Sequence, residues 1–600
     1  MNNNNKVLKR DEISDEYKWN LEDMFASDAL WEEEYEQTKE LCNKIASYQG
    51  KLTESAATLL AYFQDTDEAN YHLERIYVYA NERYHQDTAV SKYQGYASRA
   101  DSLMVMAESS SAFAEPEILE ASAETINAFY KEQPELLKYQ RAIDEILRKK
   151  AHTLSKEEEK ILANAGEIAV GPENIFSMFN NADIRFPAIK DAEGNELPVS
   201  HGTFIQLMEN KDRNIRKQAF ESMYHTYQQF GNTVASIFTS HLKQEHFFAK
   251  TKKYDSVRAM HLDQGNIPEG VYDNLIETVH KHLPAMHRYM AERKKLLGVE
   301  ELHMYDLYTP LIDDYDKKYT YEEAKETVLK GLAPMGEEYL SILKEGLSGG
   351  WIDVYENENK RSGAYSWGAY GTHPYVLLNH KDNLNSVFTL AHEMGHAIHT
   401  YYSNKTQPIT YSGYLIFVAE VASTCNEALL MQYLMKNAAD EKERRYLINH
   451  QLEEFRTTLF RQTMFAEFEQ IVHKKIADGE AMTQEALNKI YHDLNVLYYG
   501  PDVVVDEEID HEWMRIPHFY TSFYVYQYAT GYSAATAFSK LILEGGQPAV
   551  DRYVTNFLCG GCSKDPIELL KNAGVDMSTP EPVDAALQVF EEYLAMFTAK

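Results

Sequence analysis

The sequence is short of the residues that interrupt helices. Its 600 residues include 28 glycines and 17 prolines, whereas these two residues together make up about 12% of an average protein. Architectures built from many short strands need frequent turns, and turns need these residues. Their scarcity excludes a turn-rich β protein and favours long helices.

Cysteines and long apolar runs are also lacking. The four cysteines are too few for a disulfide framework in a chain of this length. No stretch approaches the 18 apolar residues of a membrane span, and the first 20 residues have no apolar segment typical of a secretion signal. We therefore expect a cytoplasmic protein.

Basic residues are greatly outnumbered by acidic ones. The chain has 59 Lys and Arg against 93 Asp and Glu, a net charge of −34. Nucleic-acid phosphates and anionic membranes both require clustered basic residues, so we expect neither as a partner. No obligate protein partner is evident. The content of 44% hydrophobic and 25% charged residues is that of a folded globular protein.

Helical periodicity dominates the chain and predicts a mainly α fold. Apolar residues recur at helical spacing in segments 31–48, 56–84, 117–165, 212–297, 382–477 and 483–597. Glycine and proline at 166–172 predict a break, and 183–198 predicts a hairpin around 193–195. Residues 349–380 are rich in Tyr, Gly and Trp and predict one small sheet.

The segment after this small sheet contains a metal-binding pattern. Residues 392–396 read His-Glu-Met-Gly-His, which places His392 and His396 one turn apart on one helix face, where both can reach a Zn²⁺ ion. Glu393 is then placed as general base for a zinc-bound water. The alternative is two surface histidines on an ordinary helix. The apolar neighbours favour the metal, because buried imidazoles need partners.

Two further residues of this helical segment bear on the identity of the third ligand. The metzincin pattern needs a third histidine where this chain has Tyr402, so that class is excluded. His399 follows His392 by two turns and is better explained as packing beside the ligands or bonding to them than as a ligand itself.

A better third ligand is a carboxylate downstream. Glu420 and Glu427 interrupt an otherwise apolar helical segment, 413–434, and share one face of it. Glu420 lies 28 residues after His392, enough for a second helix that packs antiparallel to the first. Glu427 would bond the free N–H of a ligand histidine. The alternatives are an Arg or Lys partner for Glu420 and a solvated charge for Glu427.

These motifs resemble those of one peptidase family. HEMGHAIH followed by FVAEVASTCNEALL is similar to the oligoendopeptidase F family of zinc peptidases, within the thimet oligopeptidase group. EYKWNLEDMF, LHMYDLYTPL, SGAYSWGAYGTHPYVLLNH and IPHFYTSFYVYQYATGYSAA also resemble family segments. The resemblance runs from about residue 14 to the C-terminus.

The resemblance implies a multi-helix, ellipsoidal fold with a deep substrate channel and a small antiparallel sheet beside the HExxH helix. One Zn²⁺ per chain would be held by His392, His396 and Glu420, with Glu393 as base. The edge of the sheet would bind the substrate backbone by strand addition. We expect an N-terminal helical region at 1–110, an oligopeptidase F N-terminal-type helical subdomain at 111–200, and the catalytic zinc-peptidase domain at 201–600.

The implied function is a zinc-dependent metalloendopeptidase. It would hydrolyse internal bonds of short oligopeptides by Glu-assisted attack of a zinc-bound water, in peptide catabolism. One alternative is a zinc carboxypeptidase, which uses the same ligand pattern. The other is a helical peptide-binding protein without activity, against which the intact Glu393 argues.

Two C-terminal features carry weaker signals. The resemblance implies that Tyr526 and His518 bind substrate and stabilise the oxyanion, although the spacing from His518 to YSAA is shorter than in thimet-type relatives. The alternative is an aromatic helix face packed in the core. Cys559 and Cys562 form a lone CxxC, which is better explained as a loop with two free thiols than as a zinc or redox site.

The net charge predicts electrostatic attraction of basic peptides. Rising salt screens such attraction over about 10 Å at 0.1 M, so kcat/KM for cationic peptides should fall as salt is raised, while that for neutral peptides stays constant. Steady-state kinetics over a salt series tests this, and equal salt responses of the two peptides would contradict it.

Overall fold

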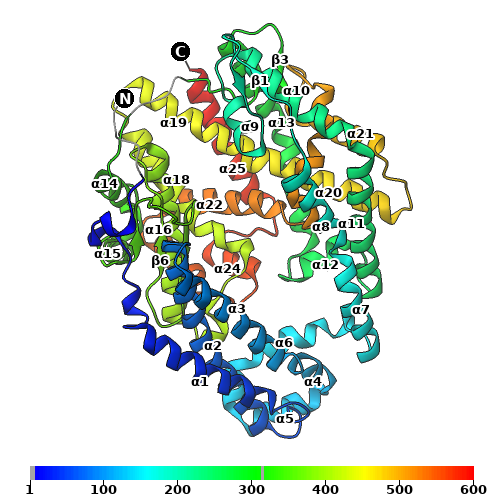
Figure 1. The fold of residues 1–600 in the computed structure, drawn as a ribbon, viewed down its shortest axis with the longest axis vertical. Helices are drawn as coiled ribbons and strands as arrows, with labels where there is room; N and C mark the ends of the chain where they lie inside the picture. Colours follow the sequence, from blue (N-terminus) through cyan, green and yellow to red (C-terminus); the bar gives the residue numbers. More distant parts are fainter. Residues whose placement is uncertain (1–6, 313–316, 600) are drawn as a thin grey trace. The chain divides into compact units, whose positions relative to one another are not determined.

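The computed structural model describes residues 7–312 and 317–599 (Figure 1). The chain forms two compact units, each assembled from three separate segments. Unit 1 takes the described residues within 1–151, 316–433 and 538–574; unit 2 takes those within 152–315, 434–537 and 575–600. The predicted division of the chain into regions 1–110, 111–200 and 201–600 stays a prediction.

Unit 1 contains most of the N-terminal helices and the helix that carries residues 392–396. Its helices are α1 (Asp28–Ala46), α2 (Ala56–Gln86), α3 (Ser91–Ser111), α4 (Ala114–Glu120), α5 (Ala123–Glu132), α6 (Gln140–Arg148), α14 (Tyr321–Gly331), α15 (Gly336–Ser348), α16 (Leu384–Thr406), α17 (Ile409–Ser412), α18 (Ile416–Lys436), α23 (Gln547–Tyr553) and α24 (Pro566–Ala573). The last turn of α18 passes into unit 2.

Unit 2 is likewise mainly helical. Its helices are α7 (Lys156–Ala169), α8 (Gly171–Met178), α9 (His201–Met208), α10 (Arg213–Gln229), α11 (Gly231–Thr251), α12 (Val257–Asp263), α13 (Glu269–Leu297), α19 (Glu441–Glu454), α20 (Arg461–Ala477), α21 (Gln484–Tyr499) and α25 (Glu581–Thr598). Helix α22 (Tyr526–Gly545) begins in unit 2 and ends in unit 1. The predicted mainly α fold is confirmed.

The helix boundaries show where turn residues misled the prediction. The helical segment predicted over 117–165 is helical and is divided among α4, α5, α6 and α7. The expected break at 166–172 is wrong at Gly166, which lies inside α7. Pro172 lies in the first turn of α8, where a proline loses no hydrogen bond because the first N–H groups of a helix have no intrahelical partner.

The strands form three small sheets in the described residues, where a hairpin and one small sheet were expected. β1 (Ile189–Lys190) and β2 (Glu196–Leu197) pair antiparallel and confirm the predicted hairpin. β3 (Leu302–His303) pairs in parallel with β7 (Val503–Val504). The third sheet has the order β4 (Ile352–Asp353), β6 (Tyr375–Leu377), β5 (Tyr365–Trp367). Strands this short show no alternation in the sequence, so their pairing over long separations was not predictable.

The third sheet is the predicted one, but it is not purely antiparallel. β5 pairs antiparallel with β6, whereas β4 pairs with β6 in parallel. The connection from β4 to β6 is long enough to return the chain in the same direction, which parallel pairing requires. The predicted position beside the HExxH helix is confirmed, because α16 packs against β5 and β6.

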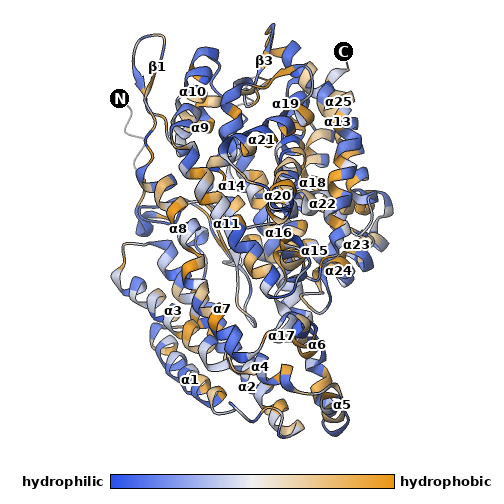
Figure 2. Ribbon diagram, turned by 90° about the vertical axis from the view of Figure 1, so that its right-hand side faces the viewer, coloured by the Kyte–Doolittle hydropathy of each residue, from blue (hydrophilic) through white to orange (hydrophobic). Residues whose placement is uncertain are grey.

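Most helices combine hydrophobic and hydrophilic residues, as the mixture of orange and blue on single helices in Figure 2 shows. In unit 1, Trp31 stacks between Tyr35 and Tyr96, at ring distances of 5.2 and 4.1 Å. A helix with one apolar face of this kind and one polar face is amphipathic. Among the described residues, none of the helices combines the length and apolarity that crossing a bilayer demands.

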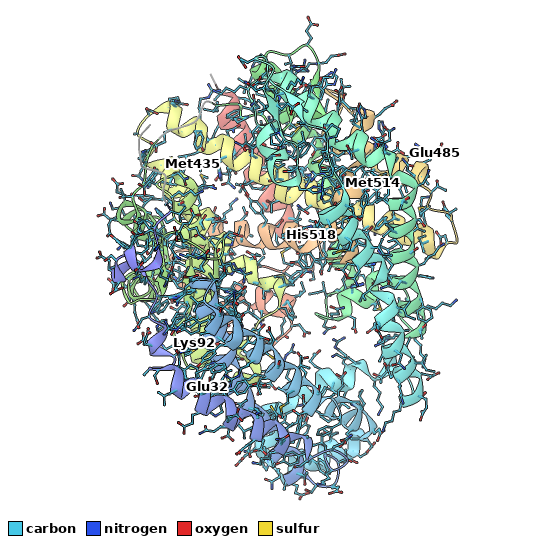
Figure 3. All side chains as sticks on the ribbon, in the orientation of Figure 1. Glu32, Lys92, Met435, Glu485, Met514 and His518 are labelled. Atoms are coloured by element: carbon cyan, nitrogen blue, oxygen red, sulfur yellow. The ribbon has the colours of Figure 1, made fainter. Side chains whose placement is uncertain are left out.

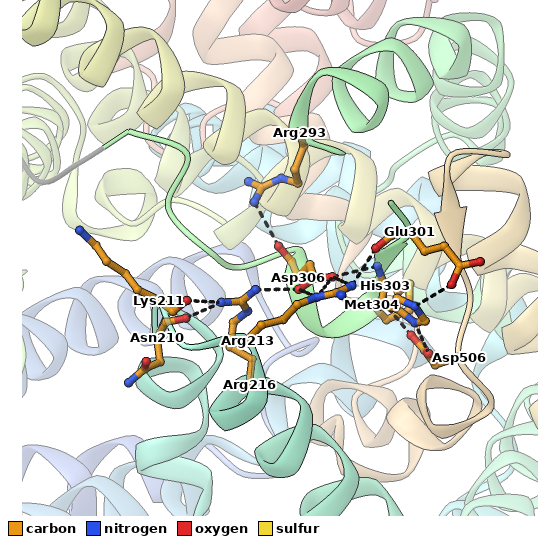
Figure 4. A network of polar contacts seen from close by, with 10 residues as sticks. All are labelled: Asn210, Lys211, Arg213, Arg216, Arg293, Glu301, His303, Met304, Asp306 and Asp506. Carbon is orange, nitrogen blue, oxygen red and sulfur yellow. Dashed lines mark hydrogen bonds and ion pairs between the residues drawn. The ribbon is translucent and has the colours of Figure 1, made fainter. Parts of the chain in front are cut away.

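The LHMYDLYTPL segment has a structural role inside unit 2 (Figure 4). Asp306 is fully buried and accepts hydrogen bonds from Arg213 at 2.8 Å and Arg216 at 2.7 Å. Burial alone would raise the pKa of Asp306, but the bonds from the two guanidinium groups outweigh it and hold that pKa below its usual range. The charged Asp306 therefore ties α10 to the segment that follows α13.

Helices α16 and α18 come into backbone contact at Gly395. A Cβ atom there would lie 2.6 Å from the Cα of Ser423 and 2.9 Å from the carbonyl oxygen of Ala422. One turn away, Asn426 Nδ2 donates to the carbonyl of Ala391 at 3.1 Å. Since rising numbers on α16 meet falling numbers on α18, the helices run antiparallel, as predicted.

Substituting Gly395 by alanine is therefore expected to force the two helices apart. Overpacking of this kind costs about 1–3 kcal/mol and should lower the midpoint of thermal unfolding. Gly95→Ala is the matched control, because Gly95 lies in α3 of the same unit with open space around it and should gain about 0.5–1 kcal/mol. Equal unfolding midpoints for Gly395→Ala and the parent would contradict the assigned contact.

Candidate metal centre

Helix α16 places the two histidines of the motif. It starts at the cap residue Asn383, whose side-chain oxygen accepts from the N–H of Ser386 at 2.9 Å. The His392 and His396 rings are 4.9 Å apart on one face. Both are half-buried, with Ala391, Met394 and other apolar residues of α16 completely buried around them.

Glu420 on α18 completes a three-residue group. Its Oε2 lies 3.2 Å from Nε2 of His392 and 3.3 Å from Nε2 of His396. Two ligands about 2.05 Å from a tetrahedral ion are separated by about 3.3 Å. His392, His396 and Glu420 are the one group of this kind among the described residues. Their two nitrogens and one oxygen are a donor set that suits Zn²⁺, so the residues fit the ion.

The charges of this group suit a cation. Burial opposes the charged form of His392, but hydrogen bonds to Glu420 and Glu427 outweigh it and raise the pKa of His392. Burial also opposes ionisation of Glu420, yet the bonds from His392 and His396 hold its pKa far below normal. The carboxylate is thus kept ionised, as a metal ligand must be.

Glu393 lies between the two histidines in sequence and is 7% exposed. Burial raises the pKa of its carboxyl group, although the neighbouring His392 and His396 lower it. A carboxylate with raised proton affinity suits a general base near neutral pH.

Glu427 contacts the first histidine of the motif. Its Oε2 is 3.2 Å from Nδ1 of His392, so it contacts the nitrogen opposite the one that faces Glu420. A carboxylate at this position fixes the orientation of the ring and makes it a better ligand.

Two supporting residues were not predicted. Ser423 donates its hydroxyl to Oε2 of Glu420 at 3.1 Å. Asn426 joins α18 to Ala391 and accepts from the hydroxyl of buried Tyr339 at 2.9 Å. Ser423 follows Glu420 by three residues and Asn426 follows Ser423 by three, and this helical spacing was the available signal.

His399 packs beside the ligands and is outside the metal-binding group. Its ring stacks on Tyr414 at 3.8 Å and lies near Phe557. Burial lowers the pKa of His399 to about 3, so the ring is neutral. Of the two roles that the sequence left open, packing is the one that these contacts support.

His518 and Tyr526 belong to unit 2. His518, labelled in Figure 3, is exposed in a short turn and lies 3.3 Å from the hydroxyl of Tyr528. Tyr524 stacks on the same imidazole. Tyr526 is buried, with its ring 5.1 Å from that of Tyr272. The catalytic roles of His518 and Tyr526 stay predictions.

Cys559 and Cys562 lie in a loop that packs on the end of α16. The carbonyl of Cys559 accepts from Thr406 at 2.9 Å and from Gln407 at 2.7 Å. Both cysteines are free, and burial raises the pKa of both thiols. Raised pKa values disfavour reactive thiolates, which agrees with a structural loop.

A helix with two histidines one turn apart and a buried glutamate between them, together with a third ligand, a carboxylate, from an antiparallel helix, defines a metallopeptidase of the HExxH class. Comparison with known proteins narrows the class. The sequence model of the protein family "peptidase family M3" matches residues 206–589, and the sequence model of the family "oligopeptidase F" matches residues 117–186. The chain belongs to peptidase family M3, oligopeptidase F, and is a metallo-oligopeptidase.

Individual relatives agree over nearly the whole chain. Oligopeptidase PepF of Bacillus subtilis is 52% identical over 98% of this chain and 88% of its own. A crystal structure from Chlamydophila abortus has a TM-score of 0.92 at 34% identity, over 99% of both chains. Oligoendopeptidase-F from Enterococcus faecium has a TM-score of 0.74 at 39% identity, over 95% of this chain and 98% of its own.

The geometry predicts separable effects of two carboxylates on metal binding. Glu420→Gln should abolish tight zinc retention by removing a ligand. Glu427→Gln should weaken it by about 10- to 100-fold, because His392 loses a charged partner. Zinc titration against a competing chelator measures both. Glu345→Gln, an exposed change on α15, is the control, and unaltered affinity in Glu427→Gln would contradict the orienting contact.

Proposed function

We propose that this chain is a zinc-dependent endopeptidase that hydrolyses internal bonds of short oligopeptides. The observation that carries the proposal is buried Glu393 beside the donor group of His392, His396 and Glu420. These three residues would hold one Zn²⁺ per chain through two imidazole nitrogens and one carboxylate oxygen. A bound Zn²⁺ supplies a Lewis acid that polarises the scissile carbonyl and acidifies water.

The residues of the chain perform the proton transfers. The carboxylate of Glu393 takes a proton from the attacking water and delivers it to the leaving amine. The raised pKa of Glu393 favours uptake of the proton, and a pKa closer to neutral pH than that of an ordinary carboxyl group still allows its release. Glu427 keeps the imidazole of His392 oriented throughout. Tyr526 and His518 are proposed to donate hydrogen bonds to the developing oxyanion.

Several features of the proposal rest on the family resemblance. A deep channel with the zinc site at its base would restrict substrates to short peptides, and the edge of β5 would bind their backbone by strand addition. A cytoplasmic location and the absence of an obligate partner suit peptide catabolism. The carboxypeptidase alternative differs only in where the substrate is cut.

Replacing Glu393 by alanine tests the assigned base. General-base removal should reduce kcat by about 10²- to 10⁴-fold or more, while zinc content stays at the parent level, because Glu393 is outside the ligand set. Cleavage of a quenched fluorescent peptide and metal analysis of the same sample measure the two effects. An active variant with zinc bound would contradict the role of Glu393.

Chelation and product analysis test the reaction class. Treatment with phenanthroline should abolish cleavage, and added zinc should restore it. Mass spectrometry of the products should then show internal cuts. Removal of single C-terminal residues would instead support the carboxypeptidase alternative, and cleavage that resists the chelator would contradict a metal-dependent reaction.

A further inference from the structure

Two exposed aliphatic side chains lie beside the metal-binding group in unit 1. Leu415 and Ile416, at the start of α18, are 42% and 47% exposed. The apolar residues that follow on the same helix, Phe417, Val418 and Val421, are buried. Exposed aliphatic residues are ordinary when they are scattered singly over a surface. An adjacent pair beside a metal ligand favours a binding surface, because ligand sites are lined mainly by apolar groups.

Ile416 shares a face of α18 with the carboxylates of the metal centre. It precedes Glu420 by four residues and Glu427 by eleven, which are about one and three helical turns. Side chains of a helix lean towards its N-terminus, so the carboxylate of Glu420 lies over the turn that begins at Ile416. The Cβ atoms of two such residues are about 5–6 Å apart. The side chain of Glu420 is 40% exposed, so a ligand can reach this face.

The segment that carries both aliphatic residues is anchored to α16. The ring of Tyr414 stacks on that of His399 at 3.8 Å, and its hydroxyl lies 2.8 Å from the hydroxyl of Thr400. The carbonyl of Leu415 accepts from the N–H of Ala419 at 3.1 Å, which joins this residue to the first turn of α18. The exposure of the two side chains is therefore a fixed feature of the surface, since the backbone on both sides of them is held.

The occupant that this surface fits is an apolar side chain of the substrate peptide. An extended peptide advances about 3.3 Å per residue, so a surface about 5–6 Å from the ligand Glu420 is reached from within two residues of a bond held at the ion. A charged side chain would lose solvation against aliphatic groups. An acidic one would also meet Glu420 and Glu427 as like charges. Aliphatic and aromatic side chains have neither disadvantage.

We propose that Leu415 and Ile416 form an apolar subsite for an aliphatic or aromatic side chain of the substrate, within two residues of the bond that is cut. The inference rests on the proposed peptidase function. The two residues determine specificity by contact with the substrate side chain and take no part in the proton transfers of Glu393. The subsite therefore changes which peptides are cut and leaves metal binding unchanged.

Isosteric substitutions at Ile416 separate the polarity of this surface from its shape. Ile416→Val keeps it apolar, whereas Ile416→Thr has the shape of the valine variant with a hydroxyl group in place of a methyl group. One peptide with a single cut, located by mass spectrometry, is varied to Leu or Ala at each of the two positions on either side of the cut. At one of these positions, the parent and Ile416→Val should prefer Leu by about tenfold or more in kcat/KM.

The two polar variants should lose this preference. In Ile416→Thr the Leu-to-Ala ratio should fall to about threefold or less. Leu415→Asn, which replaces the two methyl groups by an amide of similar shape, should lower the ratio in the same direction. The zinc content should equal that of the parent in both variants, because neither residue belongs to the donor group.

Val105→Thr is the matched control, since Val105 is a 61% exposed residue of α3 in the same unit and its change should leave the ratio of the parent. A parent without the preference at all four positions, or either polar variant with the ratio of the parent, would overturn the proposal. If the parent cleaves no peptide, the peptidase proposal fails. The dissociation constants of the Leu and Ala peptides for zinc-loaded chains that carry Glu393→Gln, with and without Ile416→Thr, then decide this one by the same ratios.

Discussion

The missing side chain of Gly395 is the constraint on which the metal centre depends. Because no Cβ intervenes, the backbones of α16 and α18 meet between Gly395 and Ser423. That approach brings Glu420 within 3.3 Å of both histidines. If the helices were pushed apart, the donor atoms that their side chains carry would also move apart. A packing requirement thus sets the coordination geometry.

Around this contact, neighbouring polar side chains hold the residues of the metal centre in place. Ser423 donates a hydrogen bond to Glu420, Glu427 contacts His392, and Asn426 links α18 to α16. Each bond limits the rotation of a group that must stay oriented. The same principle operates in unit 2, where two arginines keep Asp306 ionised inside the protein. Buried charges that are fully paired fix the arrangement of the helices that carry them.

The residues of the metal centre were predictable because they obey helical periodicity. His392 and His396 are four apart, and Glu420 and Glu427 are seven apart within apolar segments, so each pair shares a face whatever the rest of the fold does. Ser423 and Asn426 follow the same periodicity but are ordinary residues in an amphipathic helix. The packing of His399 on Tyr414 was not predictable, because periodicity places a ring on a face but does not name its neighbour.

The pairing of strands in the small sheets, in contrast, could not be predicted from the sequence. Strands of two or three residues leave too little pattern to predict their pairing, so the parallel match of β4 with β6 and the pairing of β3 with β7 appear only in the folded chain. A cavity of about 540 Å³ at the start of α16 has the same origin, since it joins Ser362–Ala364 to residues of a different element. Loops that are brought together by strand pairing have no periodic pattern in the sequence that would predict their contact.

The sequence by itself determined the helical character of the chain, the face that carries the metal-binding residues, and the family resemblance, because all three are local and periodic. The tertiary structure alone decided that Gly395 is a contact point, that the sheet is mixed, and that Tyr526 is buried against Tyr272. These properties depend on which surfaces meet across long separations in the chain, and packing, not local propensity, determines that.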